Sequence, residues 1–218
     1  MSKYIKNFSL AILGFIFLLC TNIIIIFNSN FIFKYFTIFN NTSSKLSMGL
    51  NNILTDYNNI ISYLRNPLIY KLEFNNFTLS DTAAIHFFEV KKIFFTLHLI
   101  AFIILLLFFT LMINRKFFSN HTILKTNLNN ERYQIKKYFN SIVISIILIS
   151  VIFIFLDFST LFNKFHSIVF NNDYWMFSSV NDSIINILPE NFFMICVISV
   201  LLLLLIETLL INKLIRKR

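Results

Sequence analysis

Residues 162–193 read FNKFHSIVFNNDYWMFSSVNDSIINILPENFF, and this stretch decides how the chain is organised. It holds the only tryptophan, Trp175, together with His166 and one of the two prolines. Almost wholly apolar sequence lies on either side of it. A polar, aromatic segment between two apolar runs of membrane-crossing length is expected at a membrane surface. We therefore predict that the rest of the chain holds this segment against a second polar segment around His86.

The composition predicts a polytopic membrane protein. The chain has 218 residues, of which 57% are apolar and 29 are phenylalanine. Several apolar runs reach about 18 residues, the length that crosses a bilayer as a helix. We predict a mainly α membrane protein with four transmembrane helices, a small outer α+β domain between spans 1 and 2, and a shorter outer loop between spans 3 and 4. The expected segments are span 1 (1–28), the outer domain (29–92), span 2 (93–113), a basic cytoplasmic loop (114–140), span 3 (141–161), an outer loop with the candidate site (162–191), span 4 (192–211) and a basic cytoplasmic tail (212–218).

The distribution of charge predicts the orientation. Twelve of the nineteen Lys and Arg residues fall in the expected inner segments, whereas the outer segments carry seven basic and seven acidic residues. Because cytoplasmic segments are enriched in Lys and Arg, both termini are predicted to be cytoplasmic. The same distribution argues against nucleic-acid binding as the reason for the net charge of +9. The first apolar run is too long for a typical signal-peptide core, so a retained span is favoured over a cleaved signal. Cys20 and Cys196 lie in apolar runs and are expected as free thiols.

Local patterns predict a helix and a hairpin in the outer domain. Apolar residues within 50–64 recur at helical spacing, and the Asn-Pro pair that follows is expected to end that helix. Residues 68–74 alternate in polarity, which suggests a strand, with a turn and a short partner strand over 75–79. The aromatic run 31–39 is expected either at the membrane interface or as an extension of span 1.

Two histidines, His86 and His166, fall on the expected outer side, one just before span 2 and one just after span 3. Three explanations remain open: unrelated surface histidines, a metal site, and acid–base catalysis. The metal hypothesis has little support, because the chain has no H-E-x-x-H pair. A covalent acyl-enzyme is not suggested either, because neither a G-x-S-x-G elbow nor a catalytic cysteine is visible. Glu89 lies three residues after His86, where a carboxylate on one helix face can orient an imidazole. His98 and His121 are given no role.

An ordered set of motifs resembles the lipoprotein intramolecular transacylase (Lit) family of bacterial membrane proteins. The family pattern is DF, FH followed by F, a Trp-containing segment, an Asp and L-P-E-x-F-F, with H-x-x-D-V-K upstream. The matching residues here are Asp157-Phe158, Phe165-His166, Phe170, Trp175, Asp182, Leu188-Pro189-Glu190-Asn191-Phe192-Phe193, and His86 to Lys91. Spacing and topology agree over nearly the whole chain, and the ordered combination is more specific than any one motif. Two positions depart from the pattern: Glu89 replaces the usual Asp, and Val180 stands where a Pro is common.

The resemblance implies a reaction and a location. The substrate would be a diacylated lipoprotein whose N-terminal Cys carries a thioether-linked diacylglyceryl group. The enzyme would move the sn-2 acyl chain to the α-amino group of that Cys, leaving a lyso-form lipoprotein. Because ester-to-amide transfer is downhill, no cofactor and no metal is expected. The expected partners are the diacylated lipoprotein and membrane lipid, with no nucleic acid, and the protein is expected to act as a monomer in the bacterial cytoplasmic membrane, with its site on the outer face.

The resemblance also implies site residues. The catalytic pair falls on His86 and His166, one as base and the other as donor to the oxyanion or leaving oxygen, without an assignment of which is which. Glu89 and Asp157 are expected to support them, Glu89 by orienting His86 and Asp157 as partner of His166, although a solvated helix end remains an alternative for Asp157. Residues expected to bind substrate are Phe165, Phe170, Trp175 and Asp182, with interfacial anchoring an alternative for the aromatic ones.

Two other functional classes fit the same sequence. One is a non-enzymatic assembly or regulatory protein of the membrane, for which both histidines would be dispensable. The other is an acyltransferase that uses a separate phospholipid donor, which would leave both glyceryl acyl chains in place.

Overall fold

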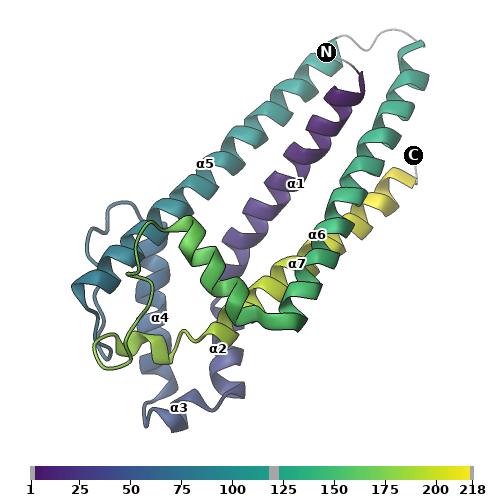
Figure 1. Cartoon of the computed structure of the whole chain (residues 1–218). Coiled ribbons are helices and arrows are strands. Elements are labelled where there is room, and N and C mark those ends of the chain that lie inside the picture. The colour runs from purple at the N-terminus through teal and green to yellow at the C-terminus, as the bar shows by residue number, and fades with distance from the viewer. Residues whose placement is uncertain (1–2, 118–122, 217–218) are drawn as a thin grey trace. The chain divides into compact units, whose positions relative to one another are not determined.

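The computed structural model describes residues 3–117 and 123–216, and helices dominate both parts (Figure 1). In chain order the elements are α1 (Lys3–Phe27), α2 (Asn30–Phe39), α3 (Thr42–Lys45), α4 (Leu50–Arg65), α5 (Asp81–Phe117), α6 (Ile123–Val169), the 3-10 helix η1 (Ser183–Asn186) and α7 (Glu190–Arg216). Four helices are long and apolar enough to cross a membrane: Lys3–Phe27, Asp81–Ile113, Asn130–Val169 and Glu190–Leu214. The predicted mainly α fold with four candidate spans is confirmed.

The long helices continue well beyond the expected limits of the spans. Helix α5 runs to Phe117 and α6 begins at Ile123, so the described part of residues 114–140 is helical. This stretch carries six Lys and Arg residues, which are good helix formers in water, so it can continue a helix that leaves the apolar phase. Residues 1–2, 118–122 and 217–218 lie outside the described residues, and with them His121 and the end of the predicted basic tail.

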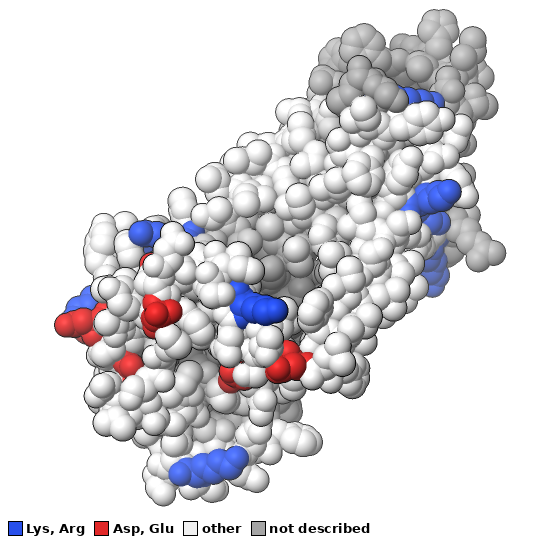
Figure 2. Space-filling view, in the orientation of Figure 1, with Lys and Arg blue, Asp and Glu red and all other residues white. Residues whose placement is uncertain are grey.

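The chain divides into two compact units. Unit 1 consists of Met1–Ile23, Leu97–Ile152 and Val200–Arg218, and unit 2 consists of Ile24–Thr96 and Phe153–Ser199. Of the ten acidic residues of the chain, eight belong to unit 2. The acidic side chains visible in Figure 2 lie over elements of that unit.

Apolar side chains hold unit 1 together, with a few polar contacts between its helices. Ala11, Phe139 and Val143 form a buried core cluster between α1 and α6. The Asn22 Nδ2 donates a hydrogen bond of 2.8 Å to Glu207 Oε2, which joins α1 to α7. Hydrogen bonds between polar side chains are a common means of holding helices together in an apolar surrounding.

Aromatic stacking organises the core of unit 2. Tyr57 of α4 is 2% exposed and stacks on Phe33 of α2 with ring centroids 3.7 Å apart, and Phe192 of α7 meets the Phe33 ring edge-on at 5.4 Å. The Tyr57 hydroxyl donates to the Phe27 carbonyl at 3.3 Å, and burial raises the pKa of this phenol. The apolar spacing of 50–64 is therefore explained by one buried face of α4.

The aromatic run 31–39 forms a helix of its own. Asn28 and Ser29 separate α1 from α2, so the run is not a continuation of the first span. Phe33 and Phe36 are buried, whereas Phe31 is 67% exposed and Phe39 is 89% exposed. This division into two faces is that of an amphipathic helix.

The predicted α+β character of the outer domain is wrong, because the described residues contain no strand. Residues 66–80, here called the outer segment after the predicted outer domain, contain turns and bends but neither helix nor strand. The alternation in 68–74 has a simpler origin: Leu72 is buried, whereas Lys71 and Glu73 are exposed and form an ion pair of 2.8 Å. An alternating pattern reports which side chains face the protein, and a strand needs a backbone partner as well.

Side chains take the place of that partner. The fully buried Asp56 of α4 accepts hydrogen bonds from the backbone N–H groups of Asn75 and Asn76, at 2.8 and 2.9 Å. Nearer the beginning of the outer segment, the Ile69 carbonyl accepts a hydrogen bond of 2.5 Å from Lys91 Nζ of α5. These contacts lead the outer segment to the beginning of α5, where the site starts.

Candidate functional site

Two helix ends in unit 2 position His86 and His166. Helix α5 begins after Ser80, whose Oγ accepts a 3.2 Å hydrogen bond from Ala83 N, and this N-cap precedes His86 by less than two turns. His166 lies in the last turn of α6, which ends at Val169. Both side chains are buried, with His86 7% and His166 9% exposed. Two titratable side chains far apart in sequence are thus enclosed at one place.

The two imidazole rings face a shared aromatic wall. Their centroids lie 5.9 Å apart. Phe170 contacts both rings, edge-on to His86 at 4.6 Å and stacked with His166 at 5.6 Å. Since both rings are buried and close together, we expect at most one of them to carry a positive charge at a time.

The surroundings of His166 determine which of its nitrogens can act as a base. Its Nδ1 lies 2.7 Å from the carbonyl oxygen of Phe162, and a carbonyl oxygen can only accept. The proton of the neutral ring is therefore on Nδ1, which leaves the lone pair on Nε2. The Nδ1 of His86, by contrast, is buried and has no hydrogen-bond partner within the described residues.

Trp175 covers the second histidine. Its ring stacks on His166 with centroids 4.7 Å apart, and its Nε1 is buried without a partner in the described part of the chain. Phe165 meets His166 edge-on at 5.3 Å. With Phe170, all three aromatic residues expected to bind substrate lie against the histidine pair.

Glu89 is engaged differently from what the sequence suggests. Its Oε1 accepts a hydrogen bond of 2.9 Å from Asn172 Nδ2, and its Oε2 is buried with no partner in the described residues. No bond from His86 to this carboxylate is formed there. The spacing of three residues places both side chains on adjacent parts of α5, but the loop after α6 supplies the partner.

Asp157 likewise has a different partner from the one expected. Its backbone is not helical, with φ −167° and ψ 94°, and it interrupts α6. Its Oδ1 accepts from Thr160 N at 3.0 Å and its Oδ2 from Thr160 Oγ1, which is the pattern of a residue that caps a helix N-terminus. Among the described residues it forms no bond to His166, and Glu190, at the start of α7, accepts a hydrogen bond of 3.2 Å from Ser159 Oγ.

Asp182 joins the loop after α6 to the start of α5. Its Oδ1 accepts from Ser80 N at 2.8 Å and its Oδ2 from Ser178 N at 3.3 Å. Next to it, three hydrogen bonds of 2.8, 3.0 and 3.1 Å join Ser183 and Thr78. Asp182, expected to bind substrate, is 5% exposed, and both of its carboxylate oxygens accept hydrogen bonds from backbone N–H groups. These contacts position the loop.

Four residues at or near the site escaped the sequence analysis. Phe162 supplies the carbonyl for His166, and Phe177 lies edge-on to His86 at 5.6 Å. Asn172 binds Glu89, and Asp56 holds the outer segment. Only Asp56 carries a signal that could have been used, because an acidic residue on the apolar face of a helix is unusual unless its oxygens are bound.

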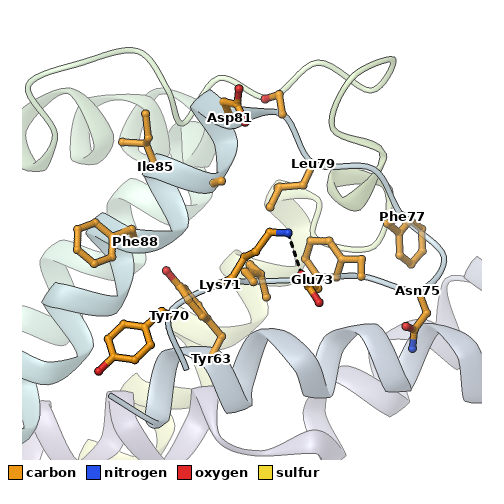
Figure 3. Close-up of a pocket in the computed structure, with 14 residues that line it drawn as sticks. Tyr63, Tyr70, Lys71, Glu73, Asn75, Phe77, Leu79, Asp81, Ile85 and Phe88 are labelled. Carbon is orange, nitrogen blue, oxygen red and sulfur yellow. Dashed lines mark ion pairs between the residues drawn. The ribbon is translucent and has the colours of Figure 1, made fainter. Parts of the chain in front are cut away.

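A separate hollow lies under the outer segment and does not include either histidine. It has a volume of about 640 Å³ and is bordered by the outer segment, α4 and the first turns of α5 (Figure 3). Tyr63, Ile85 and Phe88 line it together with the Lys71–Glu73 pair. The hydrogen bond between these two charged groups raises the pKa of Lys71 and lowers that of Glu73, so both stay charged at neutral pH.

The metal hypothesis gains no support from the geometry. In the two described ranges, no three His, Cys, Asp or Glu side chains gather as they would around one metal ion. Cys20 and Cys196 are buried free thiols.

Comparison with known proteins gives one family and one fold. A family model described as lipoprotein intramolecular transacylase Lit matches residues 8–193. Among solved structures, the membrane-integral lipoprotein intramolecular transacylase Lit from Bacillus cereus is similar with a TM-score of 0.84 at 21% identity, over 99% of this chain and 94% of that chain. A second structure of the Bacillus cereus protein, with one histidine changed to alanine, is similar with a TM-score of 0.79 at 21% identity, over 99% of this chain and 92% of that one. No curated protein matches the chain.

Proposed function

The chain belongs to the lipoprotein intramolecular transacylase (Lit) family, and from this premise we propose that His86 and His166 carry out its acyl transfer as an acid–base pair. The protein is a multi-pass membrane transacylase that moves the sn-2 acyl chain of a diacylglyceryl-Cys lipoprotein to the α-amino group of the N-terminal Cys. The product is a lyso-form lipoprotein. The observation that carries the proposal is the pairing of two buried imidazoles from residues far apart in the sequence, with ring centroids 5.9 Å apart.

We assign the role of base to His166. Its Nδ1–H is held by the Phe162 carbonyl, so Nε2 is the atom free to take a proton. The α-amino group of the substrate is an ammonium ion at neutral pH and must lose a proton before it can attack the ester carbonyl. Stacking against Trp175 holds the ring of the base in one orientation.

His86 then serves as the donor. A neutral imidazole carries one N–H, which can donate to the oxyanion that forms on the ester and then to the leaving glyceryl oxygen. The buried Nδ1 of His86 and the buried Nε1 of Trp175 lack partners among the described residues, and both adjoin His166. Buried polar atoms without partners are uncommon, so two of them at one place support a site that a substrate oxygen completes.

The proton balance of the reaction closes without a further reactant. The ammonium gives one proton to His166, and the amine forms the C–N bond as the C–O bond to the sn-2 oxygen breaks. As His86 gives its N–H proton to the leaving oxygen, its other nitrogen takes the second proton from the substrate nitrogen, so His86 stays neutral. His166 then releases its proton to water, and the net products are an amide, an alcohol and one proton. Because nucleophile and ester belong to one molecule, binding supplies effective molarity in place of a protein nucleophile.

We also propose that the site faces outward, with both termini in the cytoplasm. Twelve of nineteen Lys and Arg belong to unit 1, whereas unit 2 holds the histidine pair and eight of the ten acidic residues. The excess of positive charge in unit 1 supports this orientation.

The test is a mass spectrum of a lipoprotein N-terminal peptide from a bacterium that makes only diacylglyceryl lipoproteins and expresses this chain. We expect an unchanged lipid mass with fragmentation that shows one acyl chain on the Cys nitrogen. His86→Ala and His166→Ala should abolish the transfer of the acyl chain to nitrogen. His98→Ala, which changes an exposed histidine on the same helix as His86, should retain this transfer. A mass increase of one acyl chain would point to a phospholipid donor instead. Unchanged fragmentation with folded protein present would favour a non-enzymatic role.

A further inference from the structure

Glu89 is half-buried and uses only one of its two carboxylate oxygens. Oε1 accepts from Asn172 Nδ2 at 2.9 Å, whereas Oε2 is buried and has no partner in the described part of the chain. A carboxylate oxygen that is removed from water without a donor is costly. Such an oxygen is therefore expected to meet a donor that is absent from the isolated protein.

The nearest cations along α5 are occupied elsewhere. Lys91 donates to the Ile69 carbonyl at 2.5 Å and lies over the Tyr63 ring at 4.3 Å. Lys92 lies over the Phe88 ring at 4.3 Å. Glu89 forms no ion pair with any described residue. A half-buried carboxylate with one buried, unpaired oxygen and no cation among the described residues is complementary to a ligand that brings a positive charge.

Asn172 links this anion to the loop that begins at Phe170, whose ring contacts both imidazoles. Its Nδ2 donates to Glu89, and its Oδ1 accepts from Tyr174 N at 3.0 Å, so the amide is fixed at both ends. Asn172 follows Phe170, which contacts both imidazoles, by two residues. Glu89 itself lies one helical turn from His86.

We propose that Glu89 binds the α-ammonium group of the lipoprotein's N-terminal Cys and so forms the amine subsite of the enzyme. This inference rests on the proposed function, because only there is an amine the acceptor. Oε2 of Glu89 accepts an N–H of the ammonium, and Asn172 keeps the carboxylate aimed at it. The nitrogen is thereby held near Nε2 of His166, to which it loses its first proton.

The subsite has an effect on pH dependence that a purely structural carboxylate would not have. A negative charge next to an ammonium stabilises the charged form, so the bound amine loses its proton at a higher pH than it would without Glu89. Glu89 thus strengthens substrate binding but delays formation of the free amine. Removing its charge should raise KM and move the rise of kcat with pH toward lower pH.

The experiment compares Glu89→Gln with the wild type, on two diacylglyceryl-Cys peptides that differ only in a free or an acetylated α-amino group. Binding is followed by the fluorescence of Trp175, the only tryptophan, which stacks on His166. The wild type should bind the free amine about 10- to 100-fold more tightly than the acetylated peptide, as expected for a charged hydrogen bond. Glu89→Gln should lose this preference, and Glu89→Asp, which keeps the charge, should retain part of it.

A matched control removes a neighbouring charge that the proposal does not use. Asp173 lies next to Asn172 in the same loop and is exposed, so Asp173→Asn should keep the preference and the pH profile. An equal preference for the amine in Glu89→Gln and wild type would overturn the subsite. If Glu89→Gln does not fold, the wild-type comparison decides, because equal binding of the two peptides would also overturn it.

Failure of this inference differs from failure of the proposed function. If His86→Ala and His166→Ala abolish transfer while Glu89→Gln keeps the wild-type KM and pH profile, the histidine pair stands and the amine subsite falls. If both histidine variants transfer normally, the proposed function falls whatever Glu89 does.

Discussion

Replacing Asp56 should show whether one buried side chain holds the outer segment in place. Its two oxygens accept from Asn75 N at 2.8 Å, Asn76 N at 2.9 Å and Asn76 Nδ2 at 2.9 Å. Asp56→Asn keeps the shape but replaces one acceptor oxygen with an NH₂ group, which leaves at least one backbone N–H facing a donor. A hydrogen bond to a charged group contributes about 1.5–3 kcal/mol and an unpaired buried donor costs a similar amount, so we expect a loss of about 2–4 kcal/mol in the free energy of unfolding.

The matched control is Asn59→Ala. The Asn59 Nδ2 approaches Asp56 Oδ1 and the Glu73 carbonyl at only 3.5 and 3.4 Å, which is long for hydrogen bonds. Its removal should therefore cost about 0.5 kcal/mol or less.

The assay is thermal unfolding in detergent, followed by the fluorescence of Trp175, which lies in unit 2 as Asp56 does. For a chain of this size, the expected loss lowers the melting temperature of Asp56→Asn by about 5–10 °C. Transfer activity at low temperature should fall as well, because the outer segment leads into the first turn of α5. A melting temperature equal to that of Asn59→Ala would refute the view that side chains replace a strand ladder here.

Three further predictions concern the site and its supports. Trp175→Phe keeps a stacked ring but removes the indole N–H, so we expect transfer to slow by about 10-fold, less than in Trp175→Ala; a wild-type rate would show that the N–H is not used. Asp157→Ala removes a helix cap and should lower the melting temperature by about 2–4 °C with little change in rate, while Asp157→Ser restores stability. A loss of rate comparable to that of His166→Ala would show that Asp157 acts on the base. Asp182→Ala leaves the N–H groups of Ser80 and Ser178 without an acceptor, so KM should rise and acrylamide should quench Trp175 more strongly, and unchanged quenching would contradict the positioning role.

The sequence predicted residues that the structure brings close together, but not how they are connected. The place of His86 and His166 beside the spans and the family resemblance both point to these residues, and the two come together in unit 2. The aromatic residues Phe170 and Trp175 were selected with them and lie against the rings. The acidic residues have partners that the motifs do not predict, since Glu89 binds Asn172 and Asp157 caps the second part of α6, which agrees with the alternative of a helix end for Asp157.

What the sequence by itself determined is the set of membrane-length helices and the family. Both depend on local information, because the free energy of placing a segment in an apolar phase is a sum over its own residues, and a motif is a pattern of neighbours in the chain. The hairpin predicted from the alternation in 68–74 failed for the complementary reason, because a strand exists only where another backbone pairs with it. Only the tertiary structure decided that Asp56 would hold the outer segment, that the Phe162 carbonyl would leave Nε2 of His166 free, and that Glu89 would keep one oxygen unpaired. Those outcomes depend on which atoms of distant segments come within about 3 Å of each other. A hydrogen bond weakens when its atoms move apart by a fraction of an ångström, and a sequence pattern carries no information about such distances.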